Sequence, residues 1–171
     1  MSEPMAVIEA KGPQGMVSLR ADLTDARVAK AVRAATGCAL PEKRQIVTGE
    51  GAAVAWMSPD ELLLLVPHEA APGVAADMAG ALAGTHHLAT DVSDARAMFV
   101  IRGAGADDVV RKLCPIDIDR LPKGEIRRTR TAQVAAALWR SGEGEISLIA
   151  FRSVGGYVER LLQVAVDGGR V

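Results

Sequence analysis

The stretch 90-TDVSDARAMFVIRGAGADD-108 carries the side chains of this sequence that are best suited to chemistry. Asp91 and Asp94 are acids three residues apart with Ser93 between them, a set that could bind a metal ion or act in acid–base catalysis. No third ligand lies nearby in the sequence, so the metal signal is weak. Asp91 and Ser93 share one face of an extended strand, and such residues commonly accept backbone N–H bonds at turns. We therefore expect Ser93 or Asp94 to accept these bonds where one strand crosses to the next.

Two glycines of the same stretch, Gly103 and Gly105, resemble the start of a dinucleotide-binding fingerprint. The third glycine of the GxGxxG pattern is missing, because Asp108 occupies its position. Asp107 and Asp108 place two negative charges at the start of an expected helix, where they complement the helix dipole and repel a phosphate. The pattern therefore predicts a turn that leads into a helix, with the two aspartates capping it, rather than a phosphate site.

The histidines and cysteines do not assemble into a recognisable centre. His86 and His87 are adjacent, so on a strand they face opposite sides and cannot easily ligate one metal ion. His68 has no identifiable partner of the kind that a general base needs. Cys38 and Cys114 lack CxxC spacing, which favours neither a disulfide framework nor a zinc site. No GxSxG, HExxH or P-loop motif occurs, and we expect no catalytic, cofactor-binding or metal-binding residue on this chain.

Arginines gather in the last third of the sequence. Arg127, Arg128 and Arg130 lie at the start of an expected strand, and Arg140 and Arg152 lie on later strands. On a regular strand, Arg128 and Arg130 share one face. Because the planar guanidinium group pairs well with carboxylates, we expect a rim of salt bridges, within the chain or at an interface.

Trp56 and Trp139 each lie late in a strand that feeds a hairpin. Core packing is the default interpretation of each tryptophan, and an interface anchor is the alternative, because Trp is enriched among binding hot spots. These considerations yield one set of candidates for an interface or a vestigial ligand pocket: Trp56, Asp91, Ser93, Arg128, Arg130, Trp139 and Arg140.

The overall composition is that of a globular protein. Of 171 residues, 49% are hydrophobic and 24% are charged. The formal net charge of −1 provides no field that would attract nucleic acid or an anionic membrane. The N-terminus lacks the apolar region of a signal peptide, and no apolar run approaches the roughly 20 residues of a membrane-spanning helix. We expect a soluble, cytoplasmic protein that binds neither nucleic acid nor a membrane.

The candidate residues must be positioned by helices and strands, and the first half of the chain predicts a single series of them. Residues 1–15 predict an irregular leader, and residues 40–51 predict a polar loop with two turns. The run LLLLV at 62–66 lacks alternation, which indicates a strand buried on both faces. The expected elements form a β-α-β-β-α-β unit: strand 16–19, a helix from a cap at Thr24 or Asp25 to Thr36, strands 52–57 and 61–67 joined by Ser58-Pro59-Asp60, helix 72–82 and strand 86–92.

The second half repeats much of this order. Its expected elements are strand 97–102, a helix from Asp107 that ends before Pro115, a loop over 115–125, strands 126–132, 134–139 and 145–151, and helix 157–166 capped by Ser153. We therefore predict an α+β fold made of two fused ferredoxin-like layers, residues 16–93 and 94–171, with no flexible linker between them.

Five blocks of sequence, taken in order, carry a family resemblance: 56-WMSPDELLLL-65, 91-DVSDARAMFVIRG-103, 113-LCPIDID-119, 129-TRTAQVAAALWR-140 and 151-FRSVGGYVERLL-162. Together they resemble the γ subunits of heterotetrameric sarcosine oxidases, over nearly the whole chain from about residue 50 onward. The block DVSDARAMFVIRGAGADDVV also resembles the folate-binding aminomethyltransferase fold, so the two layers should be similar to its N-terminal part. The KGCYxGQE motif of the related iron–sulfur-repair branch does not occur here, and a one-carbon role by that route is unsupported.

The resemblance implies a complex of α, β, γ and δ subunits that oxidatively demethylates sarcosine to glycine. In that family FAD, FMN and NAD belong to the large α and β subunits, zinc belongs to δ, and tetrahydrofolate accepts the one-carbon unit on α. The γ subunit is then expected to be a non-catalytic, structural chain packed against α. The alternative expectation is a folate- or pterin-binding module whose arginine cluster meets the glutamate tail of the ligand.

Overall fold

A computed structural model describes residues 4–169 of the chain. It contains two five-stranded sheets with helices, which confirms the predicted α+β class. The chain divides into two compact units. We call residues Pro13–Asp94 the inserted unit, and residues up to Gly12 together with those from Ala95 onward the composite unit. No helix of the described residues is long and apolar enough to cross a membrane.

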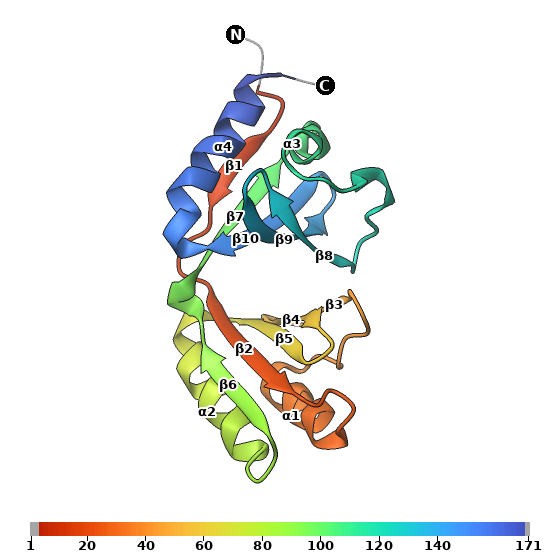
Figure 1. The fold of residues 1–171 in the computed structure, drawn as a ribbon, viewed down its shortest axis with the longest axis vertical. Helices are drawn as coiled ribbons and strands as arrows, with labels where there is room; N and C mark the ends of the chain where they lie inside the picture. Colours follow the sequence, from red (N-terminus) through yellow and green to blue (C-terminus); the bar gives the residue numbers. More distant parts are fainter. Residues whose placement is uncertain (1–3, 170–171) are drawn as a thin grey trace. The chain divides into compact units, whose positions relative to one another are not determined.

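The inserted unit is an antiparallel sheet in the order β3-β4-β5-β2-β6 with two helices on one face (Figure 1). Its core is formed by sheet residues such as Val17, Leu19 and Leu62 and by helix residues such as Val32 and Met78. The elements are β2 (Gly15–Ala21), α1 (Ala26–Thr36), β3 (Ile46–Thr48), β4 (Ala53–Ser58), β5 (Glu61–Val66), α2 (Ala71–Ala81) and β6 (His87–Asp91).

Helix α1 begins and ends where its sequence predicts. The Asp25 side chain accepts a hydrogen bond from the backbone N–H of Arg27, which satisfies one of the free donors at the helix start. Gly37 adopts φ +70°, and its N–H bonds to the carbonyl of Arg33. The buried Val28 and Val32 lie one helical turn apart, so the apolar face points into the core.

Strand β5 carries the LLLLV run, and every one of its residues is buried. Leu62 and Leu64 belong to the core under the helices, whereas Leu63 and Leu65 alternate to the other face and are 2% and 7% exposed. The prediction of a strand buried on both faces is confirmed. The loop expected over 40–51 is partly wrong, since Ile46–Thr48 forms β3 beside β4.

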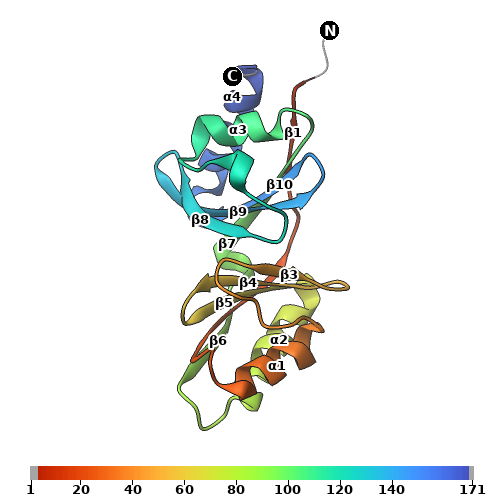
Figure 2. The same cartoon turned by 90° about the vertical axis from the view of Figure 1, so that its right-hand side faces the viewer.

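The composite unit has the sheet order β1-β7-β10-β9-β8, again antiparallel, with α3 and α4 packed on it (Figure 2). Ile101, Leu138 and Leu148 of the sheet meet Val109 of α3 and Leu162 of α4 in its core. The elements are β1 (Val7–Ala10), β7 (Arg96–Arg102), α3 (Ala106–Leu113), β8 (Ile126–Thr131), β9 (Val134–Gly142), β10 (Glu145–Phe151) and α4 (Gly155–Asp167).

Strand β1 corrects the expectation of an irregular leader over residues 1–15. Val7 pairs with Arg102 and Ala10 pairs with Phe99, so this segment is the edge strand of the composite unit. The predicted C-terminal boundary of the leader, residue 15, was also wrong, because β2 already begins at Gly15. Residues 1–3 lie outside the described part of the chain. The inserted unit runs from Pro13 to Asp94, where we expected a layer over residues 16–93. The composite unit starts at Ala95 and adds the N-terminal segment, where we expected a layer over residues 94–171 alone.

The last helix starts differently from the prediction. A 3-10 turn over Arg152–Val154 precedes α4, and Val154 occupies the cap position without a side-chain hydrogen bond. The expected cap by Ser153 is therefore wrong. The helix nevertheless buries the predicted face through Val158, Leu162 and Ala165.

Candidate functional site

Asp91 and Ser93 fix the end of β6 to the start of β2. The Ser93 hydroxyl and backbone N–H both donate to Asp91 Oδ1, at 2.5 Å and 2.9 Å. Ser93 Oγ in turn accepts the backbone N–H of Met16 at 3.0 Å, and the N–H of Val92 bonds to the Met16 carbonyl at 2.8 Å. The expected role of Ser93 as a backbone acceptor at the strand crossover is confirmed.

The same contacts determine the charge of Asp91. The hydrogen bond from the Ser93 hydroxyl is the largest cause that lowers the pKa of Asp91 below its ordinary value, and the Ser93 backbone N–H adds to it. Desolvation opposes these two hydrogen bonds by raising the pKa of Asp91, and the charge of His68, the smallest of the four causes, lowers it. Asp91 is therefore held as a carboxylate rather than poised to exchange a proton.

Removing the hydroxyl in Ser93→Ala should raise the pKa of Asp91 toward its ordinary value. Because the folded-state pKa lies below that of the unfolded chain, Asp91 contributes stability that is present above about pH 4 and is lost as the pH falls through the folded-state pKa. NMR titration of the Asp91 carboxyl carbon measures the change. The pKa of Asp22, which Thr24 lowers in the same way, should stay depressed in the variant. An unchanged Asp91 pKa would contradict the assigned cause.

Gly103 and Gly105 shape a turn beside the N-terminal segment, not a phosphate loop. Gly103 adopts φ +124°, and the N–H of Gly105 bonds to the Met5 carbonyl at 2.8 Å. A Cβ atom at Gly105 would lie 2.8 Å from that same carbonyl oxygen, so the backbones approach too closely for a side chain. The prediction of a turn that leads into a helix is confirmed, with Gly105 at the cap position of α3.

Asp107 and Asp108 do not cap α3, which corrects our expectation. They lie in its first turn, and no side chain caps the helix. Asp107 instead receives two hydrogen bonds from Arg140, at 2.8 Å and 2.9 Å, and Asp108 receives one from Arg111 at 2.6 Å. The bonds from Arg140 join α3 to β9, whereas the bond from Arg111 to Asp108 lies within α3.

Arg140 is the most connected side chain of the candidate set. Besides Asp107, it donates to the carbonyls of Ile118 and Leu121, both at 2.9 Å. The bond to Asp107 is the largest cause that raises the pKa of Arg140. This guanidinium group therefore joins β9 to α3 and to the segment that follows α3.

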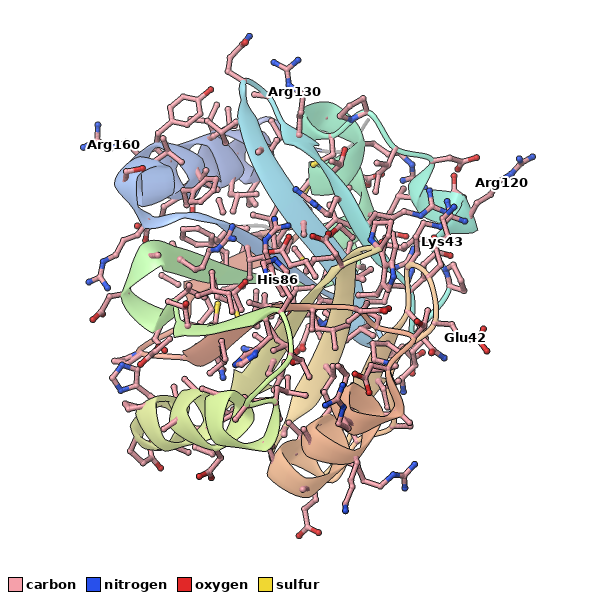
Figure 3. The ribbon with its side chains drawn as sticks, turned by 60° about the horizontal axis from the view of Figure 1, so that its bottom comes forward. Glu42, Lys43, His86, Arg120, Arg130 and Arg160 are labelled. Carbon is pink, nitrogen blue, oxygen red and sulfur yellow. The ribbon has the colours of Figure 1, made fainter. Side chains whose placement is uncertain are left out.

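Arg127, Arg128 and Arg130 lie on β8, an edge strand of the composite sheet. The expectation that Arg152 lies on a strand is wrong, because it begins the 3-10 turn that follows β10. Arg128 and Arg130 are exposed and alternate with half-buried or buried neighbours, so they share a face as expected. Arg127 forms an ion pair with Glu125, and Arg130 reaches the side-chain oxygen of Gln133 at 3.4 Å. Figure 3 shows Arg130 extending outward from the β8–β9 hairpin.

The two tryptophans lie in different units. Trp56 is half-buried and packs against the core of the inserted unit. Trp139, on β9 of the composite unit, is 6% exposed. These positions agree with the default interpretation of core packing, and the role of an interface anchor stays a prediction.

The seven candidates are divided between the two units. Trp56, Asp91 and Ser93 belong to the inserted unit, and the four others belong to the composite unit. Among residues 4–169, no group of three or more His, Cys, Asp or Glu side chains could hold a metal ion.

Sequence reasoning missed one depression of about 410 Å³ at the end of α3. Arg130 is the member of the candidate set that lines it, together with Arg111, Lys112, Leu113, Cys114, Pro115 and Ala132. Arg111 pairs with Asp108 and Asp119, and Lys112 Nζ donates to the carbonyls of Ala165 and Gly169. The feature of the sequence that could have indicated it is the pair of basic residues in the last turn of α3, before Pro115. We interpreted this segment only as the end of a helix.

Cys114 also lines this depression. Its thiol is buried and lies 3.4 Å from the hydroxyl oxygen of Thr131. Burial raises the pKa of Cys114, so the reactive thiolate is disfavoured. The thiol therefore has the character of a core residue.

Comparisons with known proteins agree with this architecture. A family model described as "Sarcosine oxidase, gamma subunit family" matches residues 20–167. The sarcosine oxidase subunit gamma of Arthrobacter sp is 37% identical over 117 residues, which are 66% of this chain and 57% of that protein. The subunit gamma of Corynebacterium sp. (strain P-1) is 36% identical over the same lengths. The chain thus spans less than two thirds of the curated relatives it matches.

Two solved structures show the same fold. A chain of the heterotetrameric sarcosine oxidase from Corynebacterium sp. U-96 in complex with pyrrole 2-carboxylate superposes with a TM-score of 0.88 at 26% identity, covering 98% of this chain and 87% of that chain. The glycine cleavage system aminomethyltransferase T from Bartonella henselae gives a TM-score of 0.68 at 10% identity, over 93% of this chain and 45% of that chain. The second likeness concerns the fold alone and agrees with the expected aminomethyltransferase-like layers.

Proposed function

Because the chain belongs to the sarcosine oxidase gamma subunit family, we propose that it is the non-catalytic γ subunit of a heterotetrameric sarcosine oxidase. Its partners are the α, β and δ subunits, of which α and β carry FAD, FMN and NAD and α binds tetrahydrofolate. The complex acts in the cytoplasm, where it oxidatively demethylates sarcosine to glycine and passes the one-carbon unit to tetrahydrofolate. The γ chain contributes to the assembly rather than to the reacting atoms.

One observation carries this proposal. The likeness to a chain of the Corynebacterium sp. U-96 enzyme covers 98% of this chain and 87% of that chain, so it includes both units. The internal bonding of the polar residues supports a structural role. Asp91, Ser93, Asp107 and Arg140 are engaged with one another or with backbone groups of this chain.

Co-expression of an affinity-tagged γ chain with the α, β and δ subunits tests the assembly. We expect γ to elute with them as one flavin-containing species on gel filtration. The purified γ chain should not turn over sarcosine, whereas the complete complex should. A γ chain that stays separate from the large subunits would contradict the proposed assembly. Sarcosine turnover by γ alone would contradict the non-catalytic role.

A second candidate function, the binding of folate or a pterin, is favoured by the depression at the end of α3. Its lining includes the cations Arg111, Lys112 and Arg130, which suit the carboxylates of a glutamate tail. Calorimetry of tetrahydrofolate against the purified γ chain tests it, with Arg130→Gln as the matched variant. A binding heat that is seen with the wild-type chain and is lost in Arg130→Gln would support the site. No binding heat with the wild-type chain at high ligand concentration would exclude it.

A further inference from the structure

The two sheets have four edge strands, and three of them carry features that discourage pairing with another chain. Strand β3 has three residues, too few to form an extended ladder. Strand β8 presents the arginines of the sequence IRRTRT. Strand β1 has four residues, and its Glu9 is held between Arg102 and Lys11. Short length and charge are the usual protections of a sheet edge.

Strand β6 lacks these protections. It has five residues, HLATD, with no proline and no acid or lysine before Asp91 at its end. Leu88 is 58% exposed, which makes it one of the large apolar side chains that the surface displays. Within residues 4–169, β6 is hydrogen-bonded to β2 on one side and lies at the margin of the sheet on the other.

The register shows which backbone groups face outward. Asp91 pairs with Val17, so the next residue, Val92, lies opposite Met16, and its N–H bonds to the Met16 carbonyl. Hydrogen-bonded and non-bonded pairs alternate along such a ladder, so Leu88 and Thr90 bond to β2. The N–H and C=O groups of His87, Ala89 and Asp91 therefore point away from the sheet.

We propose that the outer edge of β6 binds an extended segment of a partner subunit, which adds a strand to the inserted sheet. The inference rests on the proposed function, because it takes the partner from the complex. Main-chain bonds to residues 87, 89 and 91 provide affinity, and neighbouring side chains provide selectivity. The segment has an apolar side chain against Leu88, a small residue opposite Ala89 and a cation beside Asp91.

A second copy of this chain fits the edge less well. Two β6 strands paired antiparallel about Ala89 would place Leu88 opposite Thr90, so the exposed apolar side chain would gain a polar neighbour. Asp91 would meet His87, whose Nδ1 already lies 3.1 Å from the Thr85 carbonyl. The exposed Asp91 carboxylate is better matched by a Lys or Arg of a different chain.

The decisive variant is Ala89→Pro, which removes an outward N–H and leaves the bonds to β2. Ala89→Ser is its matched control, because it keeps that N–H. We expect tagged Ala89→Pro to recover at least about tenfold less of the α, β and δ subunits than wild type, and Ala89→Ser to recover a similar amount. Leu88→Lys provides a second, exposed substitution that should also weaken recovery. Circular dichroism checks that each variant is folded.

Hydrogen exchange gives an independent measurement that needs no substitution. In the wild-type complex, the amides of residues 87, 89 and 91 should exchange at least about tenfold more slowly than in the free chain. Folded Ala89→Pro and Leu88→Lys chains that assemble as well as wild type, or unchanged exchange at β6, would overturn the inference and leave the proposed function intact. Wild-type γ that fails to assemble would overturn the proposed function, and this inference with it. Protection of β6 in a homodimer of the free chain would identify a second copy as the occupant and also refute the proposal.

Discussion

Arg140→Met is expected to lower the free energy of unfolding of the composite unit by about 2–4 kcal/mol. The substitution removes two bonds to Asp107 and one each to the carbonyls of Ile118 and Leu121. Ile118 and Leu121 are 1% and 2% exposed, so water replaces the lost donors poorly. The Arg140 and Asp107 side chains are 22% and 30% exposed, which keeps the effect below that of a fully buried ion pair.

Urea unfolding, followed by the fluorescence of Trp139 in a Trp56→Phe background, measures this loss in the composite unit. Arg140→Lys keeps the charge but not the planar fork, so its destabilisation should be intermediate. Arg120→Met is the matched control, because Arg120 is 85% exposed and pairs with Asp117 at 3.3 Å. Its effect should stay within about 0.5 kcal/mol. Equal effects of Arg140→Met and Arg120→Met would contradict the role assigned to Arg140.

Leu64→Ala should destabilise the inserted unit by about 2–5 kcal/mol. Leu64 is 0% exposed at the centre of β5, between β4 and β2, and its side chain belongs to the core under α1 and α2. Truncation removes buried methyl groups and leaves a cavity that neighbouring strands cannot close without breaking their ladders.

The fluorescence of Trp56 in a Trp139→Phe background follows unfolding of the inserted unit. Val164→Ala on α4 is the control, since Val164 is 67% exposed and its replacement should change stability by less than about 0.5 kcal/mol. A loss below about 1 kcal/mol for Leu64→Ala would show that the β5 core repacks, against the expectation from its burial.

The features that sequence predicted are those with local causes. Asp25 and Gly37 act within one turn of α1, and the turn residues Ser58-Pro59-Asp60 join strands that are neighbours along the chain. The unbroken apolar run of β5 signals burial without reference to any partner. Ser93 was also predictable, because hydroxyls at strand ends commonly accept backbone bonds.

The features that were missed depend on partners far away in the sequence. Strand β1 is four residues long, and its identity comes from pairing with β7, which no local pattern encodes. The short β3 depends likewise on β4. The sequence predicted only that Asp107 lies at the start of a helix. Its ion pair with Arg140 was missed, because Arg140 lies 33 residues further along the chain. The depression at the end of α3 likewise combines that helix end with Arg130 of β8.

The membership of β1 in the composite sheet has a consequence for synthesis on the ribosome. Its partner strand β7 is made only after the whole inserted unit, Pro13–Asp94, has been translated. The inserted unit holds all five strands of its own sheet and can fold as soon as it emerges. During that interval β1 is a segment of the nascent chain without its ladder partner. If β1 were moved to the C-terminal end of the chain, the interval would remain. The strand made first would then be β7, and its edge would lack β1 until the end of synthesis.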